Sequence, residues 1–408
     1  MLNFNLNNYV YHIALTLFFL VFSINGWVKE TFAMNLNLLA GFLFFIALIK
    51  NIECIKVYIS NLIVKNFNSL EFWILLSTSL YISINNAVFI EGVSFIALFV
   101  FFNSIILYGK DNNLRGILLG CFISSIISMS GIIFGFIETI CYQTNILSSV
   151  IPINYPNPIL GIINGLFDMN WMYQISGFHL SINYAAYTMI AGMFLVNIFL
   201  KKNIKRVIIS SLILTCLLLT NAKVAFLFLA LFAINMINIK SKFYFSIFIA
   251  LLYILLCHIT MIHIGSEITD SKYYSIKILN IHNYDVYLSL FAYLKIQSLI
   301  HLMDMNFIDQ SFNTFFLFSG HDPHSVFTSI LFFAGPIGFF AFIVFLYERC
   351  SELKIDNHKN AYLLNVIFII FATEAFVWDG FDSPIFWLFI LLIRNKPKLE
   401  RIILRNVS

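Results

Sequence analysis

The stretch His321–Phe340, HDPHSVFTSILFFAGPIGFF, ends the longest polar interval in the second half of the chain and begins a membrane-length apolar segment. A helix that starts near Pro323 carries five residues on one face, because they recur with gaps of four, three, four and three: His324, Thr328, Leu331, Gly335 and Gly338. At a rise of about 1.5 Å per residue, Gly335 lies about 16 Å below His324, roughly half of the ~30 Å hydrocarbon core. Glycines at that depth let a neighbouring helix approach closely. Pro336, which has no backbone N–H, predicts a kink.

Composition places the chain among membrane proteins. Of its 408 residues, 60% are hydrophobic and 11% are charged, whereas soluble domains carry about 25% charged residues. Apolar runs long enough to cross a bilayer recur from one end to the other. We therefore expect an all-α fold, a polytopic transmembrane helix bundle that forms one integral membrane domain over residues 1–408. The opening residues, MLNFNLNNYVYH, lack a basic n-region and a cleavage site, which indicates a retained first helix.

Twelve spans are predicted, at 9–26, 34–50, 70–89, 92–109, 115–137, 180–200, 205–220, 222–239, 242–262, 324–347, 361–377 and 381–394. All but five of the 24 lysines and arginines then fall on one side of the membrane. The exceptions are Lys29, Lys223, Lys272, Lys277 and Lys295. By the positive-inside rule, this asymmetry places both termini in the cytoplasm. A turn is expected at Lys223, because a lysine midway along an apolar run has to reach water or a partner.

Two long outer loops are expected, at about 138–179 and 263–323. The first is punctuated by Pro, Asn and Gly, which is typical of irregular loops with turns. Within the second, residues 283–305 (NYDVYLSLFAYLKIQSLIHLMDM) look helical and apolar over much of the circumference, but too charged to span. We expect a surface helix there, lying on the outer leaflet or across the mouth of the bundle.

Polar residues inside or at the edge of a membrane are candidates for function. On the outer side these are His179, Lys223, His321, His324, Glu374, Asp379 and Asp382. Each also has a purely structural interpretation: Lys223 can extend to the interface, the aspartates can be turn residues, and His179 can be an interfacial anchor. Glu374 is the hardest to explain in that way, because a carboxylate in an apolar run needs a partner. We expect several of these residues to converge on one outward-facing cavity.

Familiar catalytic motifs do not occur in the sequence. There is no nucleotide-binding GxxxxGKS loop, no GxSxG and no HExxH. The six cysteines are scattered, with neither a disulfide framework nor metal-ligand spacing. We therefore expect no metal, no cofactor and no ATP-driven work within this chain.

The pattern of His324 and Ser325 followed by Gly335 and Gly338 resembles the signature of the bacterial O-antigen polymerase and O-antigen ligase superfamily. As in that family, the pattern follows a long outer loop and opens a late span. Residues 176–192 (SGFHLSINYAAYTMIAG) look like the family's Gly-Phe…Asn…Ala segment. Residues 217–232 (LLLTNAKVAFLFLALF) look like its Thr-x-Ser-Arg-x-Ala turn.

The chain departs from this family in its basic residues. Members typically hold a lipid diphosphate with outer-side arginines, whereas no arginine occurs between Arg206 and Arg349. Lys223 stands in the place of the turn arginine and offers a point charge but not a bidentate fork. For the arginine of the second outer loop, Lys272, Lys277 or Lys295 would have to substitute.

The resemblance implies a glycosyltransferase of the bacterial inner membrane that uses an undecaprenyl-diphosphate-linked glycan and needs no metal. It implies a catalytic role for His324, and its other candidate contacts to diphosphate or glycan are His179, Asn183, Lys223, His321, Ser325 and Glu374. Gly335 and Gly338 are expected to serve helix packing. Membrane lipid and a chain-length regulator are the further partners, and nucleic acid is not one.

Several functions stay open at this point. A polymerase would join repeat units on the lipid carrier, and the acidic, arginine-poor outer face favours it over a ligase that transfers glycan to lipid A core. A multi-span transporter or glycan-lipid flippase is an alternative of another class, although the halves of the chain show no paired pattern. An accessory protein without chemistry is a third alternative.

Overall fold

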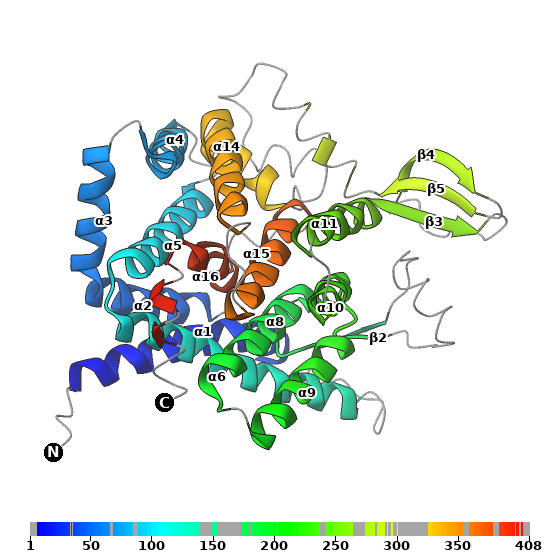
Figure 1. Cartoon of the computed structure of the whole chain (residues 1–408), viewed down its shortest axis with the longest axis horizontal. Helices are drawn as coiled ribbons and strands as arrows, with labels where there is room; N and C mark the ends of the chain where they lie inside the picture. Colours follow the sequence, from blue (N-terminus) through cyan, green and yellow to red (C-terminus); the bar gives the residue numbers. More distant parts are fainter. Residues whose placement is uncertain are drawn as a thin grey trace.

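The computed structural model of the chain describes residues 6–32, 34, 36–65, 68–84, 89–138, 149–152, 173–179, 181–201, 203–236, 242–263, 274–281, 284–289, 292, 295–296, 300, 325–353, 359–377, 383–395, 397–399 and 401–402. Helices dominate these residues (Figure 1), and one lies in each range where the sequence predicts a span. They are α1 (Leu6–Phe32), α2 (Asn37–Lys50), α4 (Leu70–Ile84), α5 (Phe89–Tyr108), α6 (Asp111–Ile137), α8 (Ile182–Phe199), α9 (Ile204–Leu219), α10 (Lys223–Met236), α11 (Lys242–His258), α14 (Val326–Leu353), α15 (Lys359–Val377) and α16 (Pro384–Leu392).

Helix starts are marked by short polar side chains that satisfy the first backbone donors. Ser181 accepts from the N–H of Asn183 at the start of α8, and Asn203 accepts from Arg206 at the start of α9. Ser383 caps α16, with proline at its first position. The helix ends therefore follow from local sequence.

Three described helices are long and apolar enough to cross a membrane alone: Asp111–Ile137, Ile182–Phe199 and Val326–Ser351. The bent pair of α2 and α3 (Ile52–Lys65) would make a fourth crossing. The shorter apolar helices have 10–17 residues. These features indicate a membrane protein, and the number of twelve spans stays a prediction.

α3 was not expected from the sequence, which places residues 51–69 simply between two spans. The helix is bent by 73° from α2. Asn51 sits at the bend, where its side-chain amide donates to the carbonyl of Ala47 (2.8 Å) and its carbonyl oxygen accepts from Asn113 (2.8 Å). Tyr58 and Leu62 are buried, which fixes one face of α3 against the bundle.

Both segments that the sequence predicts as outer loops contain strands, so the expected all-α fold is wrong there. β1 (Ser149–Pro152) pairs with β2 (Tyr173–Gly177), and β3 (Ile259–His263), β4 (Tyr274–Ile281) and β5 (Tyr284–Ser289) form a sheet in the order β3-β5-β4. The sheet projects from the side opposite the start of α1 (Figure 1).

The prediction of a surface helix over 283–305 is wrong in its first part, because Tyr284–Ser289 form the strand β5. In that strand Tyr284, Val286 and Leu288 share one face, and Asp285, Tyr287 and Ser289 share the other, so one face is apolar and the other mostly polar. The predicted span ending at 262 is likewise too long, because α11 ends at His258 and the chain continues as β3.

α14 is interrupted where the sequence predicts a kink. The non-helical residue is Gly335 (φ 64°, ψ −177°) rather than Pro336 itself, because proline disfavours helical backbone at the preceding residue and glycine tolerates positive φ. α4 packs against the break: the Ser77 hydroxyl accepts from the N–H of Gly338 at 3.1 Å. A Cβ on Gly338 would lie 3.3 Å from that of Ser77, and one on Gly335 would lie 3.0 Å from the ring of Tyr81. Both glycines thus lie in the α4–α14 contact.

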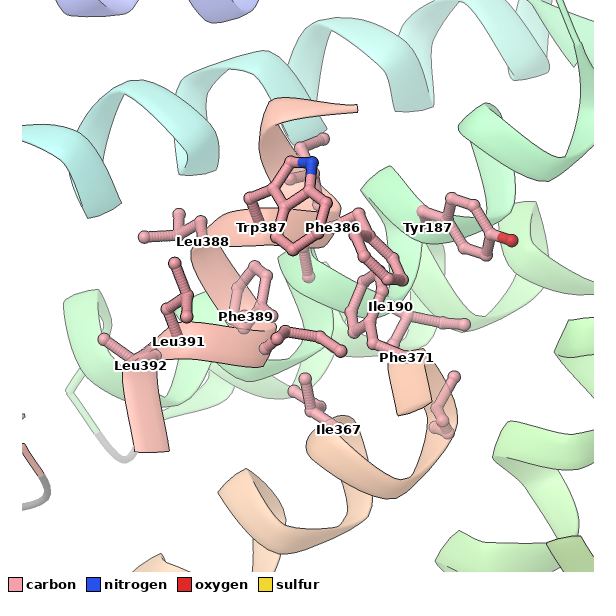
Figure 2. Packing of buried hydrophobic residues seen from close by; sticks show 14 of the residues in the cluster. Tyr187, Ile190, Ile367, Phe371, Phe386, Trp387, Leu388, Phe389, Leu391 and Leu392 are labelled. Atoms are coloured by element: carbon pink, nitrogen blue, oxygen red, sulfur yellow. The ribbon is translucent and has the colours of Figure 1, made fainter. Parts of the chain in front are cut away.

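The core surrounds α16, whose nine residues are all buried. Figure 2 shows its aromatic side chains packed against α8 and α15. Phe371 and Phe389 stack with ring centroids 5.6 Å apart, and Trp387 meets Phe95 of α5 at 5.0 Å. The hydroxyl of Tyr187 points away from this apolar cluster (Figure 2), toward a polar group on α15.

Candidate functional site

Glu374 is the polar group that organises the best-defined buried site in the described part of the chain. It lies near the end of α15 and is 2% exposed. Its Oε2 accepts a hydrogen bond from the Tyr187 hydroxyl of α8 (2.8 Å), and its Oε1 accepts one from the Tyr253 hydroxyl of α11 (2.5 Å). A carboxylate in apolar surroundings is tolerated only with such partners. Glu374 therefore connects three helices through neutral donors.

Two lysines lie close enough to Glu374 to attract it electrostatically, and both also act on Cys257 of α11. Lys223 is the first residue of α10, and Lys295 comes from the segment predicted as the second outer loop. Lys223 follows a tight turn in which Asn221 has a positive φ of 50°, a conformation that asparagine tolerates better than most residues. Among the described residues, no hydrogen bond is made by the ammonium group of Lys223, which is half-buried.

Lys295 is anchored more firmly. Its ammonium group donates to the carbonyl of Val377 (2.9 Å) and contacts Nε2 of His258 (2.9 Å). Nδ1 of His258 lies 2.6 Å from the carbonyl of Ile254 and donates to it, so Nε2 is the acceptor of the Lys295 proton. Val377 and His258 end α15 and α11, where the helix dipole favours a cation.

These residues form what we call the lysine–glutamate cluster: Tyr187, Lys223, Tyr253, Cys257, His258, Lys295 and Glu374. Their helices contact one another, since α10, α11 and α15 meet pairwise and α8 contacts α10 and α15. Two ammonium groups face one carboxylate whose two oxygens already accept hydrogen bonds. The arrangement suits an anion with several oxygens, such as a phosphate ester, held by point charges rather than by a bidentate fork.

Several residues predicted for the site lie outside the described residues. These are His321, His324, Asp379, Asp382 and Lys272. Ser325 is described and is buried: its hydroxyl accepts from the N–H of Thr328 (3.1 Å) and thereby caps the start of α14.

His179 occupies a structural position. It is 1% exposed, and its Nε2 lies 2.7 Å from the hydroxyl of Ser128 in α6. Gly177, with a φ of 62°, turns the chain so that Phe178 covers Gly131 of the same helix. Burial lowers the pKa of His179 to about 3. The contacts described for His179 fasten the turn before α8 to α6.

Asn183 lies in the first turn of α8 and is half-buried. Its backbone N–H donates to the capping hydroxyl of Ser181 (3.2 Å). In the described part of the chain, therefore, the contact of Asn183 is one of helix capping.

The structure separates Lys277 and Lys295, the two described members of the three loop lysines that the sequence left as equal candidates. Lys295 joins the cluster, whereas Lys277 on β4 pairs with Asp285 on β5 (2.7 Å) in an exposed part of the sheet. Sequence reasoning found Lys223 and Glu374 but missed Tyr187, Tyr253 and His258. The chain has 19 tyrosines, and no local pattern marks the two that reach Glu374.

Among the described residues, no group of three or more His, Cys, Asp or Glu side chains is placed to hold a metal ion. Comparisons with protein-family models, with curated proteins and with solved structures found no match.

Proposed function

We propose that the protein is an O-antigen polymerase, an integral-membrane glycosyltransferase that joins undecaprenyl-diphosphate-linked repeat units at the periplasmic face of the bacterial inner membrane. The observation that supports this most is the gathering of Lys223 and Lys295 beside Glu374. The family resemblance implies a diphosphate site built from basic residues of the span turn and the second outer loop. In this chain, the two lysines of the cluster come from those two places.

The proposed reaction is a substitution at the anomeric carbon of the donor sugar. The acceptor hydroxyl oxygen bonds to that carbon, the bond to the diphosphate oxygen breaks, and the lipid diphosphate leaves with the electron pair. Lys223 neutralises the charge that develops on the leaving group. His324 takes the acceptor proton, a role that suits an unperturbed histidine pKa of about 6.5.

Glu374 has an indirect role in this scheme. Its oxygens are engaged by two tyrosines, so it orders the helices that carry the lysines. Its negative charge offsets part of their mutual repulsion when no substrate is bound.

The experiment is a lipopolysaccharide gel of a strain that lacks the chain, complemented with variants, with undecaprenyl-linked glycans assayed alongside. Deletion is expected to leave core with a single repeat unit and no ladder. Lys223→Gln is expected to slow polymerisation by about 10²–10³, the usual cost of one charge-stabilising group. Lys277→Gln is the matched control, since that lysine is ion-paired on the exposed sheet, and should give a normal ladder.

Other outcomes contradict the proposal in distinct ways. Bare core with long polymer left on the lipid carrier means a ligase. An unchanged ladder after deletion means that the chain acts elsewhere, and transport of a glycan lipid is then the next function to examine.

A further inference from the structure

α3 has an outward apolar stripe beside its packed face. Helical geometry places Ile52, Ile59 and Ile63 within about 40° of one another around the axis. All three are exposed. Tyr58 and Leu62, about 100° away around the axis, are buried against the bundle. α3 is thus fixed to the protein on one side and leaves an apolar stripe next to it.

This stripe continues one on α2. Leu38, Phe42, Phe45 and Ile49 are exposed, and their gaps of four, three and four place them on one face. Ile52 follows Ile49 by three residues and lies on the other side of the bend of 73° between α2 and α3. In the alternative to one crossing made by both helices, α2 alone lies along the membrane normal, and the bend of 73° then turns α3 close to the plane of the membrane surface.

The charges of α2 and α3 fit an anionic surface. Lys50, Lys56 and Lys65 are exposed at the bend, in the middle and at the end of α3. The acidic side chain of α3, Glu53, pairs with Lys56 at 2.9 Å. Exposed apolar residues beside lysines are typical of helices that lie in the interface of anionic lipid, with lysine stems along the apolar surface and ammonium groups among the head groups.

We propose that α3 is an interfacial helix that docks on the anionic leaflet at the Lys50 end of α2, with Ile52, Ile59 and Ile63 in the acyl-chain boundary. α3 lies on the same side of the molecule as the start of α1 and opposite the β3–β5–β4 sheet (Figure 1). The expected orientation makes this the cytoplasmic leaflet, where anionic lipid attracts lysines near the surface. The proposal is independent of the chemistry proposed for the lysine–glutamate cluster.

The test places a fluorescent noncanonical amino acid at Ile63 of the full-length protein, reconstituted in nanodiscs of phosphatidylethanolamine and phosphatidylglycerol. Ser60, which is exposed and lies about 60° around the helix axis from Ile63, is the matched control position. One quencher is a lipid spin-labelled near the head group on its acyl chain, and the other is aqueous iodide. Both positions are exposed, so neither probe has to fit into the packed core.

We expect the lipid quencher to reduce fluorescence at least twofold more at position 63 than at position 60, and iodide to show the reverse order. Replacing phosphatidylglycerol by phosphatidylcholine should weaken the lipid quenching at position 63. Equal iodide quenching at both positions would overturn the proposal, because α3 would then face water. Protection of position 63 from both quenchers would also overturn it, since a protein partner would then cover the stripe.

Discussion

Two buried glutamates of this protein are stabilised in different ways. Glu71 of α4 accepts from the Ser69 hydroxyl (2.6 Å) and forms an ion pair with Arg394, which also donates to Asn103. Glu374 of α15 is held by tyrosine hydroxyls, and Lys223 and Lys295 attract it electrostatically. In the pair of Glu71 and Arg394, the guanidinium charge is neutralised by the carboxylate. At Glu374, the described hydrogen-bond donors are neutral hydroxyls.

The two surroundings also differ in what they connect. Arg394 follows α16 and ties the C-terminal part of the chain to α4 and α5. Close by, the ammonium group of Lys398 donates to the carbonyl of Ile105 (2.7 Å), one of the last carbonyls of α5. The Glu71 region is therefore a structural fastening. In the lysine–glutamate cluster, the two lysines come from a helix–helix turn and from a loop, where binding residues are usually found.

The largest expected effect is on the Glu71 side. Arg394→Ala leaves Glu71 buried without its cation, and we expect a loss of about 3–5 kcal/mol in the free energy of unfolding. Lys223→Ala is the matched variant for the Glu374 side and should cost clearly less, because both tyrosine hydroxyls still donate to Glu374. Thermal unfolding in detergent, followed by size-exclusion chromatography, measures both. Equal losses would remove the distinction between the two glutamates.

His179 extends the comparison to a buried base whose described side-chain partner is a neutral hydroxyl. Its pKa is about 3 in the folded protein and about 6.5 when unfolded. Because the folded pKa is the lower one, stability is complete above pH 6.5 and falls as the pH drops from 6.5 toward 3. We expect a loss of about 2 kcal/mol between pH 7 and pH 5.

His179→Gln keeps a hydrogen-bonding group next to Ser128 and should flatten this part of the pH profile. Unfolding curves at pH 7, 6 and 5 for both proteins make the measurement. The same acid loss in the variant would show that another group titrates in that range.

The smallest expected effect concerns the hydroxyl donors of Glu374. Tyr253→Phe removes one hydrogen bond to a buried acceptor and should cost about 1–3 kcal/mol, near the lower value because Tyr187 remains. Tyr187→Phe is the reciprocal variant. The double variant is the sharper measurement, since the loss should exceed the sum of the two single losses when both donors are gone. Strict additivity of the unfolding free energies would mean that the two bonds act independently.

Local sequence was sufficient for the helices. Hydropathy located a helix in all twelve predicted ranges. In hydrocarbon, backbone N–H and C=O groups have no water to bond, and a helix satisfies them within the segment itself. Hydropathy was insufficient where a short segment mixes apolar and polar residues. The charges of α3 disfavour a span, and the residues of β5 predict a helix, because the packing partners of a short amphipathic segment decide its secondary structure.

The candidate site shows the same division. Lys223 and Glu374 could be singled out from the hydropathy pattern alone, since a charged side chain within an apolar run is energetically unfavourable without a partner. Their surroundings could not, because Tyr187 and Tyr253 stand 187 and 121 residues from Glu374 along the chain. The sequence does not distinguish Lys277 from Lys295, because both are lysines of the same predicted loop. In the structure, Lys277 pairs with Asp285 in the sheet, whereas Lys295 contacts His258 at a helix end. The sequence shows where a charged side chain lies in an apolar run and needs a partner. Only the packing of helices that are distant in sequence shows which group is that partner.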